Sequence, residues 1–194
     1  RYIGSKVTVI GGGYTAMDCA RTAVRLGAET TVYYRRGPSD MVVLPGEVQE
    51  LISENGTMKY FQAPHKFFGE ASVQQAEFFK TIINVEGGKP VVDIERGSAI
   101  EINTDSVILA TGQKAETNWV SGQIGQSIMP NQAEVSVIDG FHTLHQKVFV
   151  AGDFATGATT LIDAIAHARK AASRVTQFLT GGSLPVDTVK IEKK

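Results

Sequence analysis

Cysteine is the scarcest chemically important residue of this chain, which has a single one, Cys19, among 194 residues. One thiol excludes an intrachain disulfide, a CxxC redox pair and a cysteine-ligated iron–sulfur or zinc site formed within this chain. Redox chemistry here would have to use bound organic cofactors. The histidines also lack metal-binding spacing, so we predict no metal site and assign them to loops or the surface: His65, His142, His145 and His167.

Long apolar runs and an excess of basic charge are also missing. No run is long enough for a membrane span, and no signal peptide precedes the first strand-like segment. The formal net charge of −1 gives no electrostatic footprint for nucleic acid. We therefore expect a folded cytoplasmic protein with neither a membrane nor a nucleic acid as partner. Because the chain begins with Arg1, we expect it to be part of a longer protein.

The first third of the chain has the pattern of a βαβ unit. Residues 6–10, KVTVI, form a β-branched run that ends in three glycines, which is typical of a buried parallel strand. A helix is predicted over 15–26, because small and apolar residues recur there at helical spacing and Gly27 follows as a C-cap. A second strand is expected at 30–34, TTVYY.

The middle of the chain is richer in strands. A helix over 47–53 and a strand over 58–61 are followed by strand-like runs from 65 to 103, with turns at 87–88 and 97–98. These runs predict an antiparallel meander inserted into the parallel sheet. Residues 106–110, SVILA, read again as a buried parallel strand.

The last third predicts a further segment. Residues 114–131 are polar and lack a convincing period, which favours a crossing between domains. A last strand is predicted over 148–151, followed by Gly152, Asp153 and a long helix. That helix is expected to be amphipathic, because its apolar residues fall four and three apart: Leu161, Ile165, Ala168, Ala172, Val175 and Leu179.

The segment Gly11-Gly12-Gly13-Tyr14-Thr15-Ala16 fits the GxGxxA pattern of a dinucleotide-binding loop. Gly11 would make the turn, Gly13 would let the backbone approach a pyrophosphate, and Ala16 would allow the helix to pack closely on the strand. The phosphates would bind the amides of the helix that starts near Thr15.

The end of the second strand distinguishes the two nicotinamide cofactors. NAD sites usually place a carboxylate there for the ribose 2′-hydroxyl, whereas this chain has Arg35 and Arg36. Two guanidinium groups can fork onto a 2′-phosphate, so we predict NADPH. The alternative is that the two arginines are a solvated strand end.

A second motif lies in residues 148–160, VFVAGDFATGATT. A strand that ends in Gly-Asp before a glycine-containing loop and a long helix can direct Asp153 at a sugar-like hydroxyl. The positive end of the following helix can stabilise nearby negative charge.

Four segments together resemble flavoprotein reductases with two dinucleotide-binding domains, in particular the glutamate synthase small-subunit type. They are VIGGGYTAMDCARTAVRLGA, VYYRR, VILATGQ and VFVAGDFATGATTLIDAIAHARKAA. The resemblance covers about residues 6–179 and is weak between 41 and 80. It implies an α/β fold in which residues 1–113 form a Rossmann-like NADPH-binding domain, 114–180 the C-terminal segment of an FAD-binding domain, and 181–194 a tail.

The resemblance also implies the roles of individual residues. The NADPH site would include Gly11, Gly13, Tyr14, Thr15, Ala16, Arg35, Arg36 and Gly112. The FAD site would include Gly152, Asp153, which would bind the ribityl chain, and the amides of Thr160 and Leu161 near the pyrimidine edge of the flavin.

The same family places the other half of the FAD site, and a cysteine-rich region with iron–sulfur clusters, before the NADPH domain. Hydride would pass from NADPH to FAD, and electrons would continue through iron–sulfur centres to an accepting subunit or domain. Since the cofactors carry the chemistry, we assign no catalytic residue to this chain and expect the fragment alone to be inactive.

Three alternatives remain at this point. A disulfide-reductase-type flavoprotein, such as a thioredoxin reductase relative, would need a dithiol that this chain cannot supply. A short-chain dehydrogenase would need Tyr-x-x-x-Lys downstream of the glycine loop, and the only such spacing, Tyr2 to Lys6, lies upstream. A non-catalytic NADPH-binding module needs nothing beyond the loop.

Overall fold

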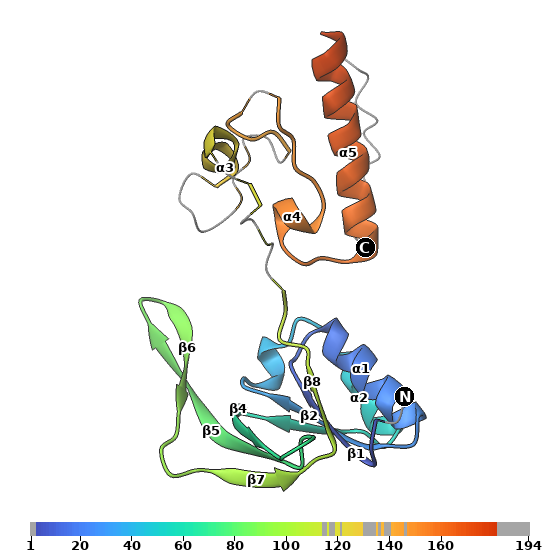
Figure 1. Ribbon diagram of the computed structural model, residues 1–194, viewed down its shortest axis with the longest axis vertical. Coiled ribbons are helices and arrows are strands. Elements are labelled where there is room, and N and C mark those ends of the chain that lie inside the picture. Colours follow the sequence, from blue (N-terminus) through green and yellow to red (C-terminus); the bar gives the residue numbers. More distant parts are fainter. Residues whose placement is uncertain are drawn as a thin grey trace. The chain divides into compact units, whose positions relative to one another are not determined.

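The computed structural model describes residues 3–113, 116, 119–120, 122–129, 135, 137, 141–145 and 147–181. The chain divides into two compact units, Arg1–Gly112 and Gln113–Lys194. Figure 1 shows both units, and each is described below by itself.

Unit 1 is built on a parallel sheet of four strands in the order β3-β2-β1-β8. The strands are β1 (Lys6–Ile10), β2 (Glu29–Tyr34), β3 (Thr57–Tyr60) and β8 (Ser106–Leu109). Helix α1 (Tyr14–Arg25) connects β1 to β2, and α2 (Pro45–Ser53) connects β2 to β3. The predicted βαβ unit is therefore confirmed, with β1 at the predicted bounds.

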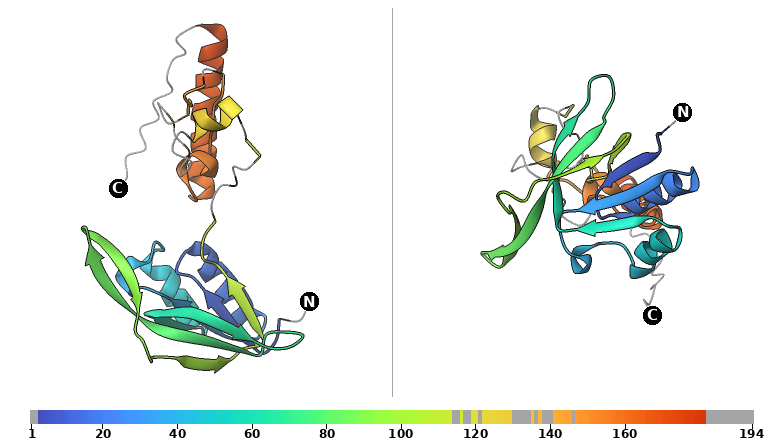
Figure 2. Two further views of the ribbon diagram at one scale, coloured as in Figure 1. Left: turned by 60° about the vertical axis from the view of Figure 1, so that its left-hand side comes forward. Right: turned by 90° about the horizontal axis from the view of Figure 1, so that it is seen from below.

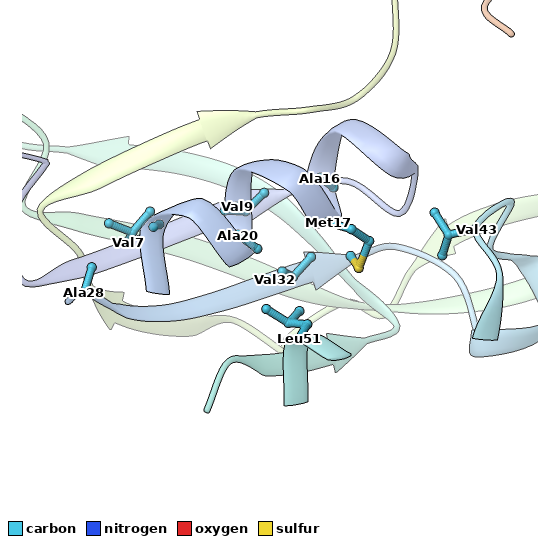
Figure 3. Close-up of a cluster of buried hydrophobic side chains, with 10 residues drawn as sticks. Val7, Val9, Ala16, Met17, Ala20, Ala28, Val32, Val43 and Leu51 are labelled. Atoms are coloured by element: carbon cyan, nitrogen blue, oxygen red, sulfur yellow. The ribbon is translucent and has the colours of Figure 1, made fainter. Parts of the chain in front are cut away.

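One face of the parallel sheet packs against the two helices. The small residues Ala16, Ala20 and Ala23 of α1 let the helix approach Val7 and Val9 of β1, and all five are buried. Figure 3 shows this core, in which Met17 and Leu51 fill the space near Val32. Side chains alternate in direction along a strand, so the odd-numbered residues of β1 form this core and the even-numbered ones face the other side.

The other face is covered by antiparallel strands, as Figures 1 and 2 show. They are β4 (Gln62–Phe68), β5 (Gln75–Glu86), β6 (Lys89–Ile94) and β7 (Ile100–Asn103). The ring of Tyr33 stacks on Phe78 of β5 at a centroid distance of 4.0 Å, and Ile10 and Ala76 complete this second core.

The order of these strands corrects one detail of the meander. The turn at Gly87 and Gly88 joins β5 to β6 as predicted, but 97–98 is not a turn between paired neighbours. Both β6 and β7 pair with β5, β7 with residues 75–78 and β6 with residues 81–86. The long strand β5 therefore pairs with β7 in its first part and with β6 in its last part.

Ion pairs join α1 to α2 at the surface of unit 1. The Arg21 guanidinium donates to both carboxylate oxygens of Glu54, at 3.1 and 2.8 Å, and also pairs with Glu50. Arg25 donates to Glu54 at 2.6 Å. Glu54 caps the end of α2, so the two arginines fix that end against α1.

Unit 2 contains α3 (Gly122–Ile128), α4 (Asp153–Thr156) and α5 (Leu161–Thr180). Helix α3 was not expected in the segment 114–131. The predicted strand over 148–151 is wrong: in the described residues only Phe149 forms a bridge, with His142. A strand needs a partner along its length, and the backbone of this segment bonds only to residues 141–145.

The apolar stripe of α5 is mostly exposed in this chain. The buried residue of this helix is Ala171, with Ala164, His167 and Val175 half-buried on the same side. Leu161, Ile165, Ala168, Ala172 and Leu179 of the predicted stripe are exposed. Helical periodicity locates an apolar stripe but does not say which neighbours are there to cover it. Neither α5 nor any other described helix is both long and apolar enough to cross a bilayer.

Candidate functional site

The carboxyl ends of the parallel strands bring three predicted segments of unit 1 to one edge. Gly11 follows β1, Arg35 follows β2, and Gly112 lies three residues after β8. Strand order is β2-β1-β8, so the glycine loop lies between the other two segments. Ligands of open α/β sheets bind at this edge.

Gly11 is required by the geometry of the loop. Its φ of +146° is unfavourable for any other residue, and a Cβ atom there would lie 2.2 Å from the carbonyl oxygen of Ala110. The Gly11 amide donates to the carbonyl of Tyr33 at 3.0 Å, which joins the loop to the end of β2. Gly12 is constrained by a side chain and not by its backbone conformation, because its Cβ would lie 2.5 Å from the ring of Tyr34.

The loop leads into the amino end of α1, which begins at Tyr14. Gly13 is the N-cap residue and supplies no side chain, and no side chain caps the helix. Tyr14 and Thr15 are exposed, whereas Ala16 is fully buried against the sheet. The Ala16 amide donates to the Gly13 carbonyl at 3.0 Å, whereas the amides of Tyr14 and Thr15 precede the first helical hydrogen bond, so this end can bind an anion. Ala16 can serve the site only by allowing close packing.

The two arginines at the end of β2 differ in burial. Arg35 is exposed and Arg36 is half-buried. The Nε atom of Arg36 is buried and has no hydrogen-bond partner among the described residues. In that part of the chain neither guanidinium forms an ion pair. Buried polar groups are almost always paired, so the Nε of Arg36 is an exception among the described residues.

Residues 35–40, here called the arginine loop, are held by bonds that the sequence did not reveal. The Thr81 hydroxyl of β5 donates to the Arg35 carbonyl at 2.7 Å, and the Phe61 amide donates to the Arg36 carbonyl at 3.2 Å. The Tyr34 hydroxyl donates to the Asp40 carbonyl at 2.9 Å. A threonine on a remote strand has no local pattern that would have identified it.

The second group of predicted residues lies around the start of α5 in unit 2. Gly152 has φ +65° and ψ −154°, a conformation open mainly to glycine, and it precedes Asp153. The Oδ1 atom of Asp153 accepts from the hydroxyl of Thr159 at 3.0 Å. Thr160 caps α5 by accepting from the amide of Asp163 at 3.2 Å. Gly152, Asp153, Thr160 and Leu161 are thereby brought to one end of the helix.

His167 is a residue of this second group that sequence reasoning missed. Its Nδ1 atom accepts from the Gly152 amide at 3.0 Å, and its ring lies 4.5 Å from that of Phe141. It is half-buried on α5, so the expectation of a loop or surface position is wrong for this histidine. It fixes the turn that carries Asp153.

Two further observations concern the remaining candidate groups. Cys19 is partly buried on α1, where it packs against the main core. No group of three or more His, Cys, Asp or Glu side chains among the described residues is arranged to hold a metal ion.

The parallel sheet, its glycine loop and the helix after it define a dinucleotide-binding α/β fold of the Rossmann type. The chain belongs to the pyridine nucleotide-disulphide oxidoreductase family, whose profile matches residues 2–173. This finding confirms the predicted fold class and the predicted relationship.

Individual proteins are similar to this chain in sequence or in fold. The glutamate synthase [NADPH] small chain of Escherichia coli is 31% identical over 188 residues, which cover 91% of this chain and 39% of that protein. The structure of FprA from Mycobacterium tuberculosis in complex with NADPH covers 94% of this chain and 56% of its own, with a TM-score of 0.67 and 15% identity. Lactococcus lactis thioredoxin reductase gives a TM-score of 0.74 at 18% identity, covering 93% of this chain and 55% of its own. The chain thus spans about two fifths of the length of the curated relative.

Proposed function

We propose that this chain binds NADPH through unit 1 and contributes the C-terminal part of an FAD site through unit 2. The observation that carries the proposal is the arginine pair at the carboxyl end of β2, beside the glycine loop that follows β1. The similarity to an NADPH-dependent small chain supports this choice of cofactor.

The residues of unit 1 fit NADPH. Gly11 and Gly12 leave no space for a side chain, and the space beside Gly13 is open, with only Val42 within 4 Å of a Cβ placed there. A pyrophosphate could therefore approach the uncapped end of α1 closely. The guanidinium groups of Arg35 and Arg36 would form charge-assisted hydrogen bonds with the 2′-phosphate.

The residues of unit 2 fit one part of FAD. Of the two carboxylate oxygens of Asp153, Oδ1 accepts hydrogen bonds from Thr159 and Oδ2 accepts none from the described residues. Oδ2 is therefore left for a ribityl hydroxyl. The Thr160 hydroxyl is used by Asp163, so Thr160 and Leu161 would act through their amides at the start of α5.

In the whole protein, bound NADPH would supply a hydride and bound FAD would accept it and release electrons one at a time. This chain would hold and orient both groups, and it requires no general acid or base for that task. We include in the proposal an N-terminal region that completes the FAD site and carries iron–sulfur clusters, an electron-accepting subunit or domain, and a cytoplasmic location. The length of the relative supports a further region, since it is more than twice as long as this match.

The test is the affinity of the full protein for NADPH and NADH after replacement of Arg35 and Arg36 by Ala. Each charge-assisted bond to a phosphate contributes about 1.5–3 kcal/mol, so we expect the preference for NADPH over NADH to fall by at least about tenfold. Equilibrium titration of both nucleotides measures the ratio of the two dissociation constants.

Arg96→Ala is the matched control, because Arg96 is exposed after β6 and far along the chain from the glycine loop. It removes one positive charge and should leave the ratio unchanged. An unchanged ratio in the double variant would remove the assignment of NADPH to this site.

A further inference from the structure

We propose that Thr81 and Tyr34 are positioning residues for cofactor choice, because their hydroxyl groups hold the arginine loop in a preformed shape. This inference rests on the proposed function of Arg35 and Arg36. It adds that the antiparallel strands inserted into unit 1 help to decide between NADPH and NADH, although Thr81 itself lies outside the predicted phosphate contacts.

Thr81 braces the loop from the antiparallel sheet. Its side chain is buried, with the residue 6% exposed, and its hydroxyl donates to the Arg35 carbonyl at 2.7 Å. Its own amide donates to the Phe61 carbonyl at 2.9 Å. Thr81 thus joins the backbone of the arginine loop to the residue where β3 passes into β4.

Phe61 extends the brace by one residue. It has a φ of +56°, and its amide donates to the Arg36 carbonyl at 3.2 Å. Its ring lies so close to Gly37 that a Cβ there would be 2.8 Å from the ring. The Arg35 carbonyl is therefore fixed by β5, and the Arg36 carbonyl by the residue that leads into β4.

Tyr34 closes the loop from the other end. Its hydroxyl donates to the Asp40 carbonyl at 2.9 Å, and its ring lies against Gly12 of the glycine loop. The Asp40 carboxylate in turn accepts from the Gly37 amide at 3.1 Å. These bonds close the arginine loop on itself, and the ring of Tyr34 places it against the glycine loop.

The bonds that hold the arginine loop matter most for the cofactor that contacts the two arginines. A backbone that already holds the two arginines near their bound positions loses less conformational freedom on binding, which favours the phosphate complex. NADH has no 2′-phosphate, so a preformed arginine loop adds little to its affinity. Loss of a bracing hydroxyl should therefore weaken NADPH more than NADH.

The experiment compares Thr81→Val with Thr81→Ser in the full protein. Valine keeps the shape of threonine and removes the hydroxyl, and serine keeps the hydroxyl. From the net contribution of one hydrogen bond, we expect Thr81→Val to raise the dissociation constant of NADPH about fivefold and that of NADH less than about twofold. Thr81→Ser should restore the original ratio.

Thr104→Val is the control for a merely structural loss. Thr104 is also buried, and its hydroxyl donates to the Ser106 carbonyl at 2.9 Å, at the opposite end of β8 from Gly112. This variant should lower the melting temperature without changing the ratio of the two dissociation constants. Tyr34→Phe tests the second brace independently if Thr81→Val does not fold.

The outcomes separate this inference from the proposed function. Folded Thr81→Val and Tyr34→Phe could both keep the original ratio of the NADPH and NADH dissociation constants while the double arginine variant loses it. In that case the positioning role of Thr81 and Tyr34 is wrong and the NADPH site stands. If the arginine variant also keeps the ratio, the site itself is wrong. An equal change of the ratio in Thr104→Val would reduce the effect to general destabilisation and overturn the inference.

Discussion

Helices α1 and α5 both follow a glycine-containing loop, yet their packing differs. Helix α1 buries Ala16, Met17, Ala20 and Ala23 against a sheet that the same unit provides. Helix α5 buries only Ala171 and leaves Leu161 76% and Ile165 60% exposed. Near α5 the described chain offers a single bridge, His142 to Phe149, instead of a sheet. A loop-and-helix pattern therefore becomes a closed core only where the strands beside it are present.

The largest expected effect tests this difference in packing. Met17→Ala removes a fully buried side chain and should lower the free energy of unfolding of the 194-residue chain by about 2–5 kcal/mol. Ile165→Ala removes an exposed side chain and should change it by less than about 0.5 kcal/mol. Denaturant titrations monitored by circular dichroism measure both.

The same pair in the full protein sharpens the comparison. If the proposed N-terminal region packs against α5, Ile165→Ala should cost more there than in the 194-residue chain. Equal costs for Met17→Ala and Ile165→Ala in the shorter chain would show that α5 is as well packed as α1, and would break the contrast.

The two glycine turns give a smaller effect. Gly11→Ala should cost about 1–3 kcal/mol for its backbone conformation, and further destabilisation because the new Cβ would meet the Ala110 carbonyl. It should also abolish NADPH binding. Gly152→Ala has a similar conformational cost, but nothing lies within 4 Å of its Cβ. Thermal unfolding and NADPH titration compare the variants, and a larger loss for Gly152→Ala would contradict the prediction.

The smallest effect is the acid sensitivity of the ion pairs between α1 and α2. Hydrogen bonds from Arg21, and then from Arg25, lower the pKa of Glu54 from its ordinary 4.5 to about 2. A carboxyl group whose pKa is lower in the folded state stabilises the fold above about pH 4.5, and this contribution is lost as the pH falls from about 4.5 towards 2. Solvent screening keeps the effect small, because the group is at the surface.

Glu54→Gln should therefore destabilise the chain at pH 7 and have less effect at pH 3. Melting temperatures at pH 7 and pH 3 measure this difference. Glu70→Gln is the control, because Glu70 is exposed and lies outside the ion pairs between α1 and α2. An equal loss at both values would mean that Glu54 acts through packing and not through its charge.

Much of unit 1 could be predicted because its signals are local. The run 6–10 predicts β1 at its observed bounds, and the spacing of alanines predicts α1 to within one residue at each end. The exception is the relation of β6 and β7, which both pair with β5. Pairing depends on where the chain travels between strands, and no local pattern encodes that.

Unit 2 was less predictable for the same reason. The run 148–151 has the composition of a strand, but a strand exists only with a partner, and here a bridge at Phe149 is all that forms. The periodicity of α5 is real, yet the face that packs contains Ala171 and His167. The site residues of both units stay predictions that the proposed experiments test.

The sequence by itself determined the glycine loop, the arginine pair and the parallel βαβ unit, because each depends on residue types at short spacing. Only the tertiary structure decided what holds the arginines in place. Thr81 reaches the Arg35 carbonyl across 46 positions of the chain, and the Phe61 amide reaches the Arg36 carbonyl. Both bonds come from the antiparallel strands or from the residue that leads into them, a long-range arrangement that residue spacing does not express.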